Sequence, residues 1–230
     1  MKLARYILML FPLLVLFGTP AAAEPIKITL EFEPDLENGK RSFEICVRCH
    51  LPEAWGNDDG TYPQLAGQHV NVLMKQLLDI RSGKRQNPLM YPFVQKRTLG
   101  GYQSLSDVVA YISTLPMTPA HTMGPWPQAT SQYKQGKVLY EKNCAQCHGT
   151  QGEGNNMLSY PRLQGQHYPY MRRQAIRVRD GLRKVDPAMD ASFKSLSFHE
   201  IEQVLNFISY LQPPKEDLAP SINWRNPDYQ

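Results

Sequence analysis

The sequence predicts an all-α protein built from two tandem copies of one unit of about 100 residues. Residues 62–69 read YPQLAGQH, and 98 positions later residues 160–167 read YPRLQGQH. Apolar residues recur at the spacing of amphipathic helices, and no stretch shows the alternation typical of a strand. A chain of 230 residues is also long enough for two small domains.

Three helices are expected in each copy. The apolar residues between 70 and 80 have helical spacing and end before Gly83, a common helix stop. The equivalent helix of the second copy follows the second GQH sequence. Ser197 and Glu200 predict a capping box at the start of the last helix. The other expected helices cover about residues 38–49, 102–115, 132–147 and 198–212.

The first 23 residues have the pattern of a secretory signal peptide. Lys2 and Arg5 give a positive start, an apolar run follows over residues 6–17, and small residues at 21–23 form a cleavage site. We therefore expect the mature chain to begin at Glu24. The alternative is a membrane anchor, but the run is shorter than the ~20 apolar residues that cross a bilayer.

Removal of this leader lowers the formal charge of the chain from +4 to +2, because Lys2 and Arg5 leave with it. So small a charge does not suit a nucleic-acid-binding protein, and no nucleic-acid partner is expected. No later stretch is apolar enough to span a membrane, so we expect a soluble mature protein.

All four cysteines lie in two CxxCH motifs, one in each copy. The motifs consist of Cys46, Cys49 and His50 and of Cys144, Cys147 and His148. Structural disulfides would not explain a histidine after each pair. A four-cysteine zinc site usually holds its pairs about 15–20 residues apart, much closer than these two pairs. A thioredoxin-like redox pair needs a βαβ setting, which the sequence lacks.

Covalent haem attachment explains every residue of both motifs. Two thiols three residues apart on a helix can each form a thioether with one haem vinyl group, and the adjacent histidine then reaches the iron. We therefore expect two covalently attached haem c groups, one on each motif, with His50 and His148 as iron ligands.

Methionine is expected as the second ligand of each iron, because its thioether favours ferrous iron and raises the reduction potential. Met90 lies in a loop that reads NPLM, about 40 residues after the first motif. Met189 lies in the equivalent loop of the second copy, which reads DPAM. We favour these two residues. The other candidates are Met74 and Met171, which lie in expected helices, Met117, which follows the last helix of the first copy, and Met157, which lies close behind the second motif.

The remaining histidines have weaker claims to an iron. His69 and His167 occupy equivalent positions at expected helix starts and could in principle bind iron, but each site has a better candidate. His121 and His199 are expected at the surface.

Four prolines between residues 116 and 130 indicate a semi-rigid linker that spaces two domains. The first domain then covers residues 24–115 and the second residues 131–212. A proline-containing tail, residues 213–230, is expected to wrap the surface or to fray.

The two motifs, the paired YPxLxGQH segments and the paired Pro-x-Met loops resemble the cytochrome c4 family, which are dihaem class I c-type cytochromes of the bacterial periplasm. The resemblance covers about residues 37–211. It implies two tandem class I cytochrome c domains packed face to face, each wrapped around a haem whose iron is held by His and Met. It also implies that the carbonyls of Pro63 and Pro161 accept hydrogen bonds from the ligand histidines, which fixes ring orientation and basicity.

Two features depart from the family's pattern. The first motif is followed by LPEAW at residues 51–55, where the second is followed by GTQG at residues 149–152. The tail after Leu211 is also longer than expected. Both features affect the surfaces that partners would contact, and neither affects haem attachment.

The resemblance implies an electron-transfer protein without a substrate of its own. It would carry single electrons between a dehydrogenase or quinol-oxidising complex and a terminal oxidase or reductase, and peripheral association with a membrane surface is compatible with this role. One alternative is a cytochrome subunit bound tightly to a periplasmic dehydrogenase. Another is a dihaem enzyme such as a peroxidase, which is less expected because both haems have a methionine candidate and no cysteine is free to serve as a ligand.

The haem-free chain is predicted to fold poorly, because cores this small are marginal and the haem supplies much of the apolar filling. Thermal unfolding followed by circular dichroism should show no cooperative transition for chain produced without haem. The haem-loaded protein serves as the control, and a sharp transition in both would contradict the prediction.

Overall fold

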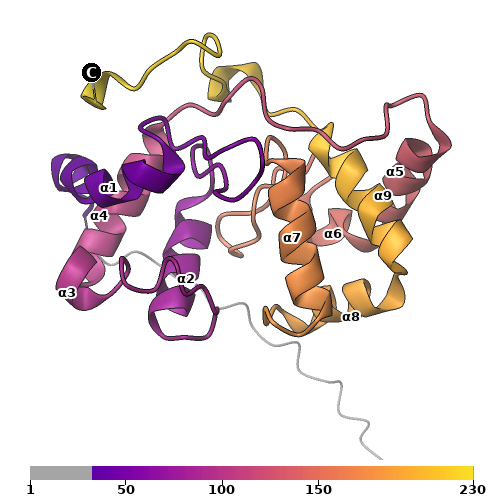
Figure 1. Ribbon diagram of the computed structural model, residues 1–230, viewed down its shortest axis with the longest axis horizontal. Helices are drawn as coiled ribbons and strands as arrows, with labels where there is room; N and C mark the ends of the chain where they lie inside the picture. The colour runs from indigo at the N-terminus through magenta and orange to yellow at the C-terminus, as the bar shows by residue number, and fades with distance from the viewer. Residues whose placement is uncertain (1–32, 230) are drawn as a thin grey trace, which may run out of the picture.

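The computed structural model of the chain describes residues 33–229, and the predicted leader at 1–23 lies outside them. Two helical halves lie side by side, and the C-terminal segment runs back over the first half (Figure 1). None of the helices in the described part is long and apolar enough to cross a membrane. The helices are α1 (Leu36–His50), α2 (Val70–Arg81), α3 (Lys96–Leu99), α4 (Tyr102–Thr114), α5 (Ser131–Asn143), α6 (Ala145–His148), α7 (Tyr168–Arg179), α8 (Pro187–Ser195), α9 (Phe198–Ser209), η1 (Lys215–Asp217) and η2 (Pro227–Tyr229).

The same helix crossing organises both halves. α1 packs on α4 in the first half, and α5 packs on α9 in the second. Each crossing is centred on a glycine that allows close approach of the two backbones. A Cβ atom on Gly39 would lie 2.2 Å from the carbonyl oxygen of Asp107, and one on Gly136 would lie 2.1 Å from that of Gln203. No larger residue fits at either crossing without moving a helix.

Side-chain caps mark the starts of α1, α5, α8 and α9. The side chain of Asp35 accepts from the backbone N–H of Asn38 at the start of α1. The predicted capping box of Ser197 and Glu200 is confirmed at the start of α9. One expected helix is divided, because the backbone leaves helical geometry at Cys144, which separates α5 from α6.

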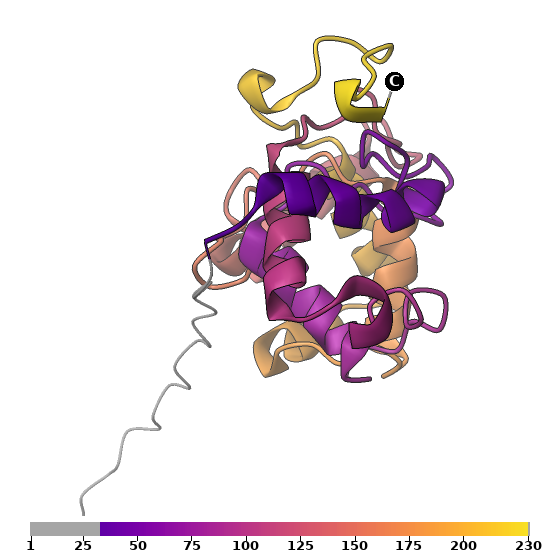
Figure 2. The same cartoon turned by 90° about the vertical axis from the view of Figure 1, so that its left-hand side faces the viewer.

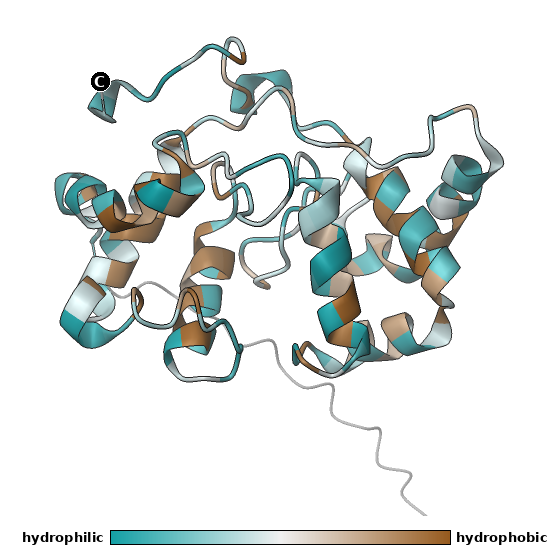
Figure 3. Cartoon of the chain, in the orientation of Figure 1, coloured by the Kyte–Doolittle hydropathy of each residue, from teal (hydrophilic) through white to brown (hydrophobic). Residues whose placement is uncertain are grey.

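Each half has its own apolar core, to which brown residues of the packed helices contribute (Figure 3). Phe43 and Leu105 are fully buried in the first core, and Tyr140 is fully buried in the second. The tail adds Ala219 to the first core, although it leaves the second half of the chain after α9. The first core is therefore completed by residues from the far end of the sequence.

The proline-containing segment 116–130 was expected to space two domains, but its first part, up to Gly124, packs against both halves, whereas most of residues 125–129 are exposed. The indole N–H of Trp55 donates to the carbonyl of Pro116 at 2.8 Å. Met117 is 3% exposed, and the backbone N–H of Thr118 donates to the side-chain oxygen of Gln64 at 2.7 Å. The prolines restrict the path of a segment whose first part is held by contacts with both halves.

The prediction that His121 lies at the surface is wrong. This side chain is 6% exposed, and its Nε2 lies 2.8 Å from the carbonyl oxygen of Ser209 at the end of α9. The residue lies in the packed segment between the halves, which sequence patterns alone described as a linker. His199 is exposed, as expected.

The tail attaches to the loop that follows the first CxxCH motif. Trp224 packs against Trp55 with ring centroids 5.9 Å apart. The side-chain amide of Asn226, which is 2% exposed, donates to the carbonyl of Pro52 at 2.7 Å and to the hydroxyl of Tyr111 at 3.0 Å. The two departures from the family's pattern, the LPEAW loop and the long tail, therefore contact each other.

The LPEAW loop has positive φ values at two positions where the second half has glycine. Gly149 and Gly152 have φ values of 80° and 73° in the second half, and their counterparts Leu51 and Ala54 have φ values of 65° and 58°. A positive φ in such sparsely populated backbone regions costs a residue with a Cβ atom roughly 1–3 kcal/mol. Contacts from the tail, at Pro52 and Trp55, stabilise the loop in this geometry.

Trp224→Ala is predicted to destabilise the haem-loaded protein by roughly 2–3 kcal/mol, because it removes a large ring packed on Trp55. Denaturant unfolding followed by circular dichroism measures the loss. Ile222→Ala is the control, since that side chain lies in the same tail but is 50% exposed, and it should change the stability by less than ~0.5 kcal/mol. Equal effects of the two substitutions would contradict the role given to Trp224.

Candidate haem sites

Both CxxCH motifs lie at helix ends with their thiols unlinked. Cys46, Cys49 and His50 occupy the last turns of α1, while the second motif runs from Cys144 through α6 to His148. All four cysteines are free and partly buried, so the disulfide interpretation does not apply to this structure. Within residues 33–229 no three His, Cys, Asp or Glu side chains come together as a metal-ion site, which also excludes a four-cysteine zinc site there.

The leading thiol of each motif lies in an apolar setting. Burial raises the pKa of Cys46 to about 12, and the neighbouring Cys49 adds to the shift. Burial likewise raises the pKa of Cys144 to about 12, with a contribution from Cys147. Metal-binding and redox-active cysteines need the thiolate and usually have lowered pKa values. These surroundings favour an uncharged sulfur, such as that of a thioether.

The two ligand candidates are buried and held in the same way. His50 is 4% exposed, and its Nδ1 lies 3.1 Å from the carbonyl oxygen of Pro63. His148 is 8% exposed, and its Nδ1 lies 3.0 Å from that of Pro161. The contacts implied by the resemblance are thus present in both halves. A proton on Nδ1 donated to the carbonyl leaves Nε2 with a lone pair for iron.

Burial keeps both imidazoles neutral at physiological pH. It lowers the pKa of His50 to about 4, although the Pro63 carbonyl opposes the shift. The pKa of His148 is lowered by burial too, again against the opposing effect of the Pro161 carbonyl. Iron binds the neutral form of histidine, so the two rings are in the required state without losing a proton first.

Two tyrosines beside the motifs were not among the predicted site residues. Tyr62 lies with its ring centroid 6.0 Å from that of His50, and interaction with Cys49 raises its pKa. The pKa of Tyr160 is raised by burial and by Cys147. The sequence contains a signal for both residues, because they begin the two YPxLxGQH segments.

The favoured methionines follow equivalent helices but lie in different local structures. Met90 is half-buried in a turn, where its backbone N–H donates to the carbonyl of Asn87 at 3.1 Å. Met189 was expected in a loop but lies in the first turn of α8, because Asp186 caps that helix and Pro187 begins it. In the first half, the segment between α2 and α3 lies at the end opposite α1 (Figures 1 and 2).

Three of the other candidate methionines are packed in the described part of the chain, and the fourth is exposed. Met74 and Met171 are 3% and 6% exposed and belong to the two apolar cores, whereas Met157 is 55% exposed. Met117 is buried between Gly67 and Gly165, where an added Cβ atom would lie within 2.6 Å of its side chain. These surroundings favour packing roles for Met74, Met171 and Met117.

The loops that hold the histidines also join the two halves through reciprocal hydrogen bonds. The side-chain amide of Gln68 contacts the backbone of Arg162, accepting from its N–H and donating to its carbonyl, both at 2.9 Å. Gln166 makes the same pair of contacts with the backbone of Gln64, at 3.1 and 2.9 Å. Because the residues are related by the 98-residue repeat, the contact has the two-fold character of a symmetric dimer. We call these contacts the seam.

His69 and His167, once considered as iron ligands, belong to this seam. The Nε2 of His69 lies 2.8 Å from the carbonyl oxygen of Glu153, and that of His167 lies 2.9 Å from that of Trp55. The carbonyl partners are again related by the repeat. Both rings therefore bridge the halves.

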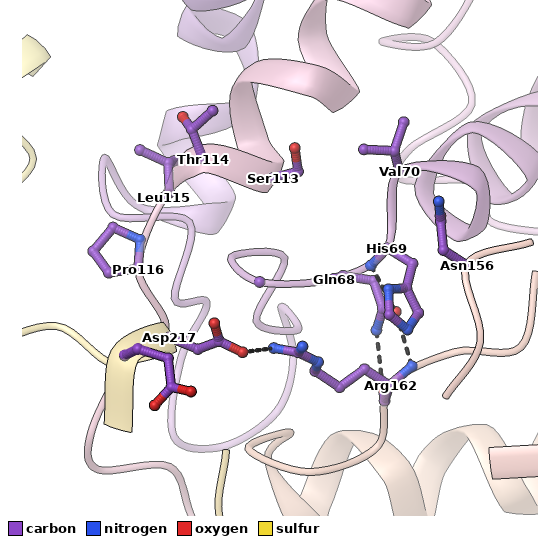
Figure 4. Close-up of a pocket in the computed structure, with 12 residues that line it drawn as sticks. Gln68, His69, Val70, Ser113, Thr114, Leu115, Pro116, Asn156, Arg162 and Asp217 are labelled. Carbon is purple, nitrogen blue, oxygen red and sulfur yellow. Dashed lines mark hydrogen bonds and ion pairs between the residues drawn. The ribbon is translucent and has the colours of Figure 1, made fainter. Parts of the chain in front are cut away.

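A pocket of about 360 Å³ opens beside the seam, between the two halves and the tail. Figure 4 shows the Arg162 side chain reaching Asp217 while its backbone is held by Gln68. The Arg162–Asp217 ion pair measures 2.7 Å and ties the seam to η1. The tail is thus connected to both halves.

Comparison with known proteins agrees with this architecture. The cytochrome c domain family matches residues 133–212. Cytochrome c4 of Thiocapsa roseopersicina is 32% identical over 179 residues, which cover 73% of this chain and 87% of the relative. The chain belongs to the cytochrome c4 family.

Further relatives place the chain among electron-transfer proteins. The reduced recombinant cytochrome c4 of Pseudomonas stutzeri superposes with a TM-score of 0.66 at 28% identity, covering 78% of this chain and all of that one. A thiosulfate dehydrogenase electron acceptor of Stutzerimonas stutzeri is 31% identical, over 71% of this chain and 77% of the relative. Cytochromes c4 are dihaem electron carriers, and the two CxxCH motifs of this member fit two covalent haem c groups.

Gln166→Ala is predicted to disturb the first haem site although the residue lies in the second half. The substitution leaves the backbone of Gln64 without two partners, next to the carbonyl that holds His50, at a cost of about 1–3 kcal/mol. Proton NMR of the oxidised protein should show shifted haem resonances for the first site. Gln135→Ala, on the exposed surface of α5, is the control. Changes confined to the second haem would contradict the coupling.

Proposed function

We propose that this protein is a periplasmic one-electron carrier in which His50 and Met90 hold one haem iron and His148 and Met189 hold the other. Each bound haem supplies a ferric–ferrous couple. The residues of the chain hold the ligand rings neutral and oriented, and they exclude water from one side of each site. The identical anchoring of both histidines by Pro63 and Pro161 is the observation that carries this proposal.

The methionine assignment is supported by elimination and by position. Met74, Met117 and Met171 are buried in packed surroundings, so Met90 and Met189 are the half-buried candidates at equivalent places after α2 and α7. A His and Met ligand pair leaves no open position on iron, which suits electron transfer better than catalysis.

Two relatives support the proposed electron donors and acceptors. A dehydrogenase or quinol-oxidising complex would donate the electrons, and a terminal oxidase or reductase would accept them. One relative is a thiosulfate dehydrogenase electron acceptor, which supports a dehydrogenase as the donor. Another, a subunit of a cbb3-type cytochrome c oxidase, supports the acceptor end, although the alignment covers only 43% of that relative.

The proposal keeps the predicted organisation of the chain. A leader at residues 1–23 would direct export, and the division into domains at residues 24–115 and 131–212 would place one haem in each. The packed segment 116–130 and the tail then hold the domains together.

Met90→Ala and Met189→Ala are each predicted to lower the reduction potential of one haem and to remove the methionine–iron charge-transfer band of that haem alone. The loss of a soft thioether ligand disfavours the ferrous state. A redox titration followed by absorption measures both effects.

Met157→Ala and Met123→Ala are the matched controls, because these side chains are 55% and 45% exposed. They should leave both bands intact. If the bands persist in the Met90 and Met189 variants, the ligand assignment is wrong. Binding of carbon monoxide to the reduced wild-type protein at neutral pH would instead support an enzyme with an open iron position.

A further inference from the structure

Positive charge gathers at one end of the two halves. Residues 172–184 contain six Lys and Arg against one Asp, although the whole chain carries only +4. The loop after α2 adds Lys84 and Arg85. We define the basic face as Lys84, Arg85, Arg173, Arg177, Arg183 and Lys184. None of these six forms an ion pair in residues 33–229, whereas Arg172 pairs with Glu202 at 2.7 Å.

Two arginines lie close together at the centre of the basic face. Arg85 of the first half and Arg183 of the second both donate to the side-chain oxygen of Gln174, at 3.3 and 2.9 Å. Arg85 also donates to the hydroxyl of Tyr170 at 3.1 Å. The partners are neutral, so these hydrogen bonds fix the guanidinium groups without cancelling their charge.

Two further arginines of the basic face connect the two halves. Arg177 of α7 donates to the carbonyl of Gln86 in the loop after α2, at 2.9 Å. Arg173 donates to the carbonyl of Thr61 at 2.9 Å. The loop that precedes Met90 therefore contacts α7, and the shared contact with Gln174 brings Arg85 and Arg183 to the same face.

The acidic residues that face this cluster do not neutralise it. Asp79 pairs with Lys75, and Asp59 lies near Arg173 without forming an ion pair. Burial lowers the pKa of Arg183 to about 10, with Arg85 adding to the shift, so the group stays charged at neutral pH. Burial opposes ionisation of Tyr170, yet the surrounding arginines outweigh it and lower its pKa. The charged side chains that act on Tyr170 and Arg183 are therefore mostly positive.

Exposed apolar side chains accompany the basic face. Leu89, next to Met90, is 70% exposed, and Leu182, next to Arg183, is 51% exposed. The loops that carry them lie at the same end of the two halves in Figure 1. Apolar side chains with charged neighbours are typical of surfaces that bind other proteins.

We propose that the basic face, with Leu89 and Leu182, is the docking surface for an acidic region of a soluble redox protein. The inference rests on the proposed function, because the surface includes the loops that lead to Met90 and Met189. Carboxylates of the partner fit the arginines, whose planar guanidinium groups suit two-point contacts. Docking here brings the partner beside both haem sites at once.

A protein partner suits this surface better than a membrane surface. The apolar side of α7 is buried, with Met171 and Ala175 in the second core and Val178 also buried, so this helix has no apolar face to insert into lipid. The arginines are held by hydrogen bonds to carbonyls and amides, and such fixed groups match a shaped partner.

Reduced flavodoxin, a small acidic one-electron donor, is the probe for this surface. We expect its rate of haem reduction at low salt to fall at least tenfold in the variant Lys84→Glu/Lys184→Glu, and the salt dependence of the rate to weaken. Both lysines are exposed, so the substitutions leave the core unchanged. Stopped-flow absorption measures the rate.

Lys134→Glu/Lys142→Glu is the control with the same change of net charge, placed on the exposed surface of α5. A rate within twofold of wild type is expected for it. Equal slowing of the two variants overturns the proposal, because net charge alone would then explain the effect. An unchanged flavodoxin rate, combined with loss of binding to phosphatidylglycerol vesicles, overturns it in favour of a membrane surface.

Reduction by ascorbate separates this proposal from the proposed function. If both haems of the Lys84→Glu/Lys184→Glu variant are reduced by ascorbate and keep their methionine bands, the protein is still an electron carrier. A slow flavodoxin reaction in that same sample then reports on docking alone. Absence of the bands in wild type would instead contradict the proposed function.

Discussion

The hydrogen bond from each proposed ligand histidine to a proline carbonyl 13 residues later connects the candidate haem sites to the rest of the molecule. The carbonyl belongs to a loop that begins with Tyr62 or Tyr160 and ends in the seam. Immediately after Pro63, the backbone of Gln64 is held by Gln166 of the other half. Ring orientation and domain packing therefore depend on one short stretch of backbone in each half. Displacement of this loop would alter the orientation of the histidine ring and the seam together.

The loops after the two CxxCH motifs have the same backbone geometry but are stabilised differently. In the second half, glycines at 149 and 152 adopt left-handed geometry at little cost. Leu51 and Ala54 adopt it in the first half, where the loop receives contacts from Trp224 and Asn226 of the tail. A loop that is less favourable by itself is stabilised by a segment that the other loop does not have. The unusual loop sequence and the extended tail are therefore linked through direct contacts.

Much of the fold could be predicted because its signals are local. The CxxCH motifs, the helical stripes and the capping box of Ser197 and Glu200 each depend on residues close in sequence. Asp186 and Pro187 are also a local signal that Met189 lies in a helix. The expectation of a loop came instead from the equivalence of Met189 with Met90 of the first half.

Features that depend on distant residues were not predicted. His121 has no helical pattern around it, and its burial follows from contact with Ser209 at the end of α9. The prolines of segment 116–130 indicate stiffness but not what the segment packs against. The roles of Gln68 and Gln166 were equally hidden, because a repeated polar residue does not reveal its partner. The repeat identified the two YPxLxGQH segments as related, and only the structure showed that these segments contact each other.

In the seam, side-chain amides on one half bond to backbone groups on the other half. Gln68 and Gln166 act through their amide groups, so both positions carry the same residue. Their targets at positions 64 and 162 are read through the peptide backbone, which is the same for any residue other than proline. One copy therefore carries glutamine there and the other arginine, and Arg162 forms an ion pair with Asp217 that has no equivalent at Gln64. Duplicated units joined in this way can differ chemically at their contact while keeping nearly the same hydrogen-bond distances.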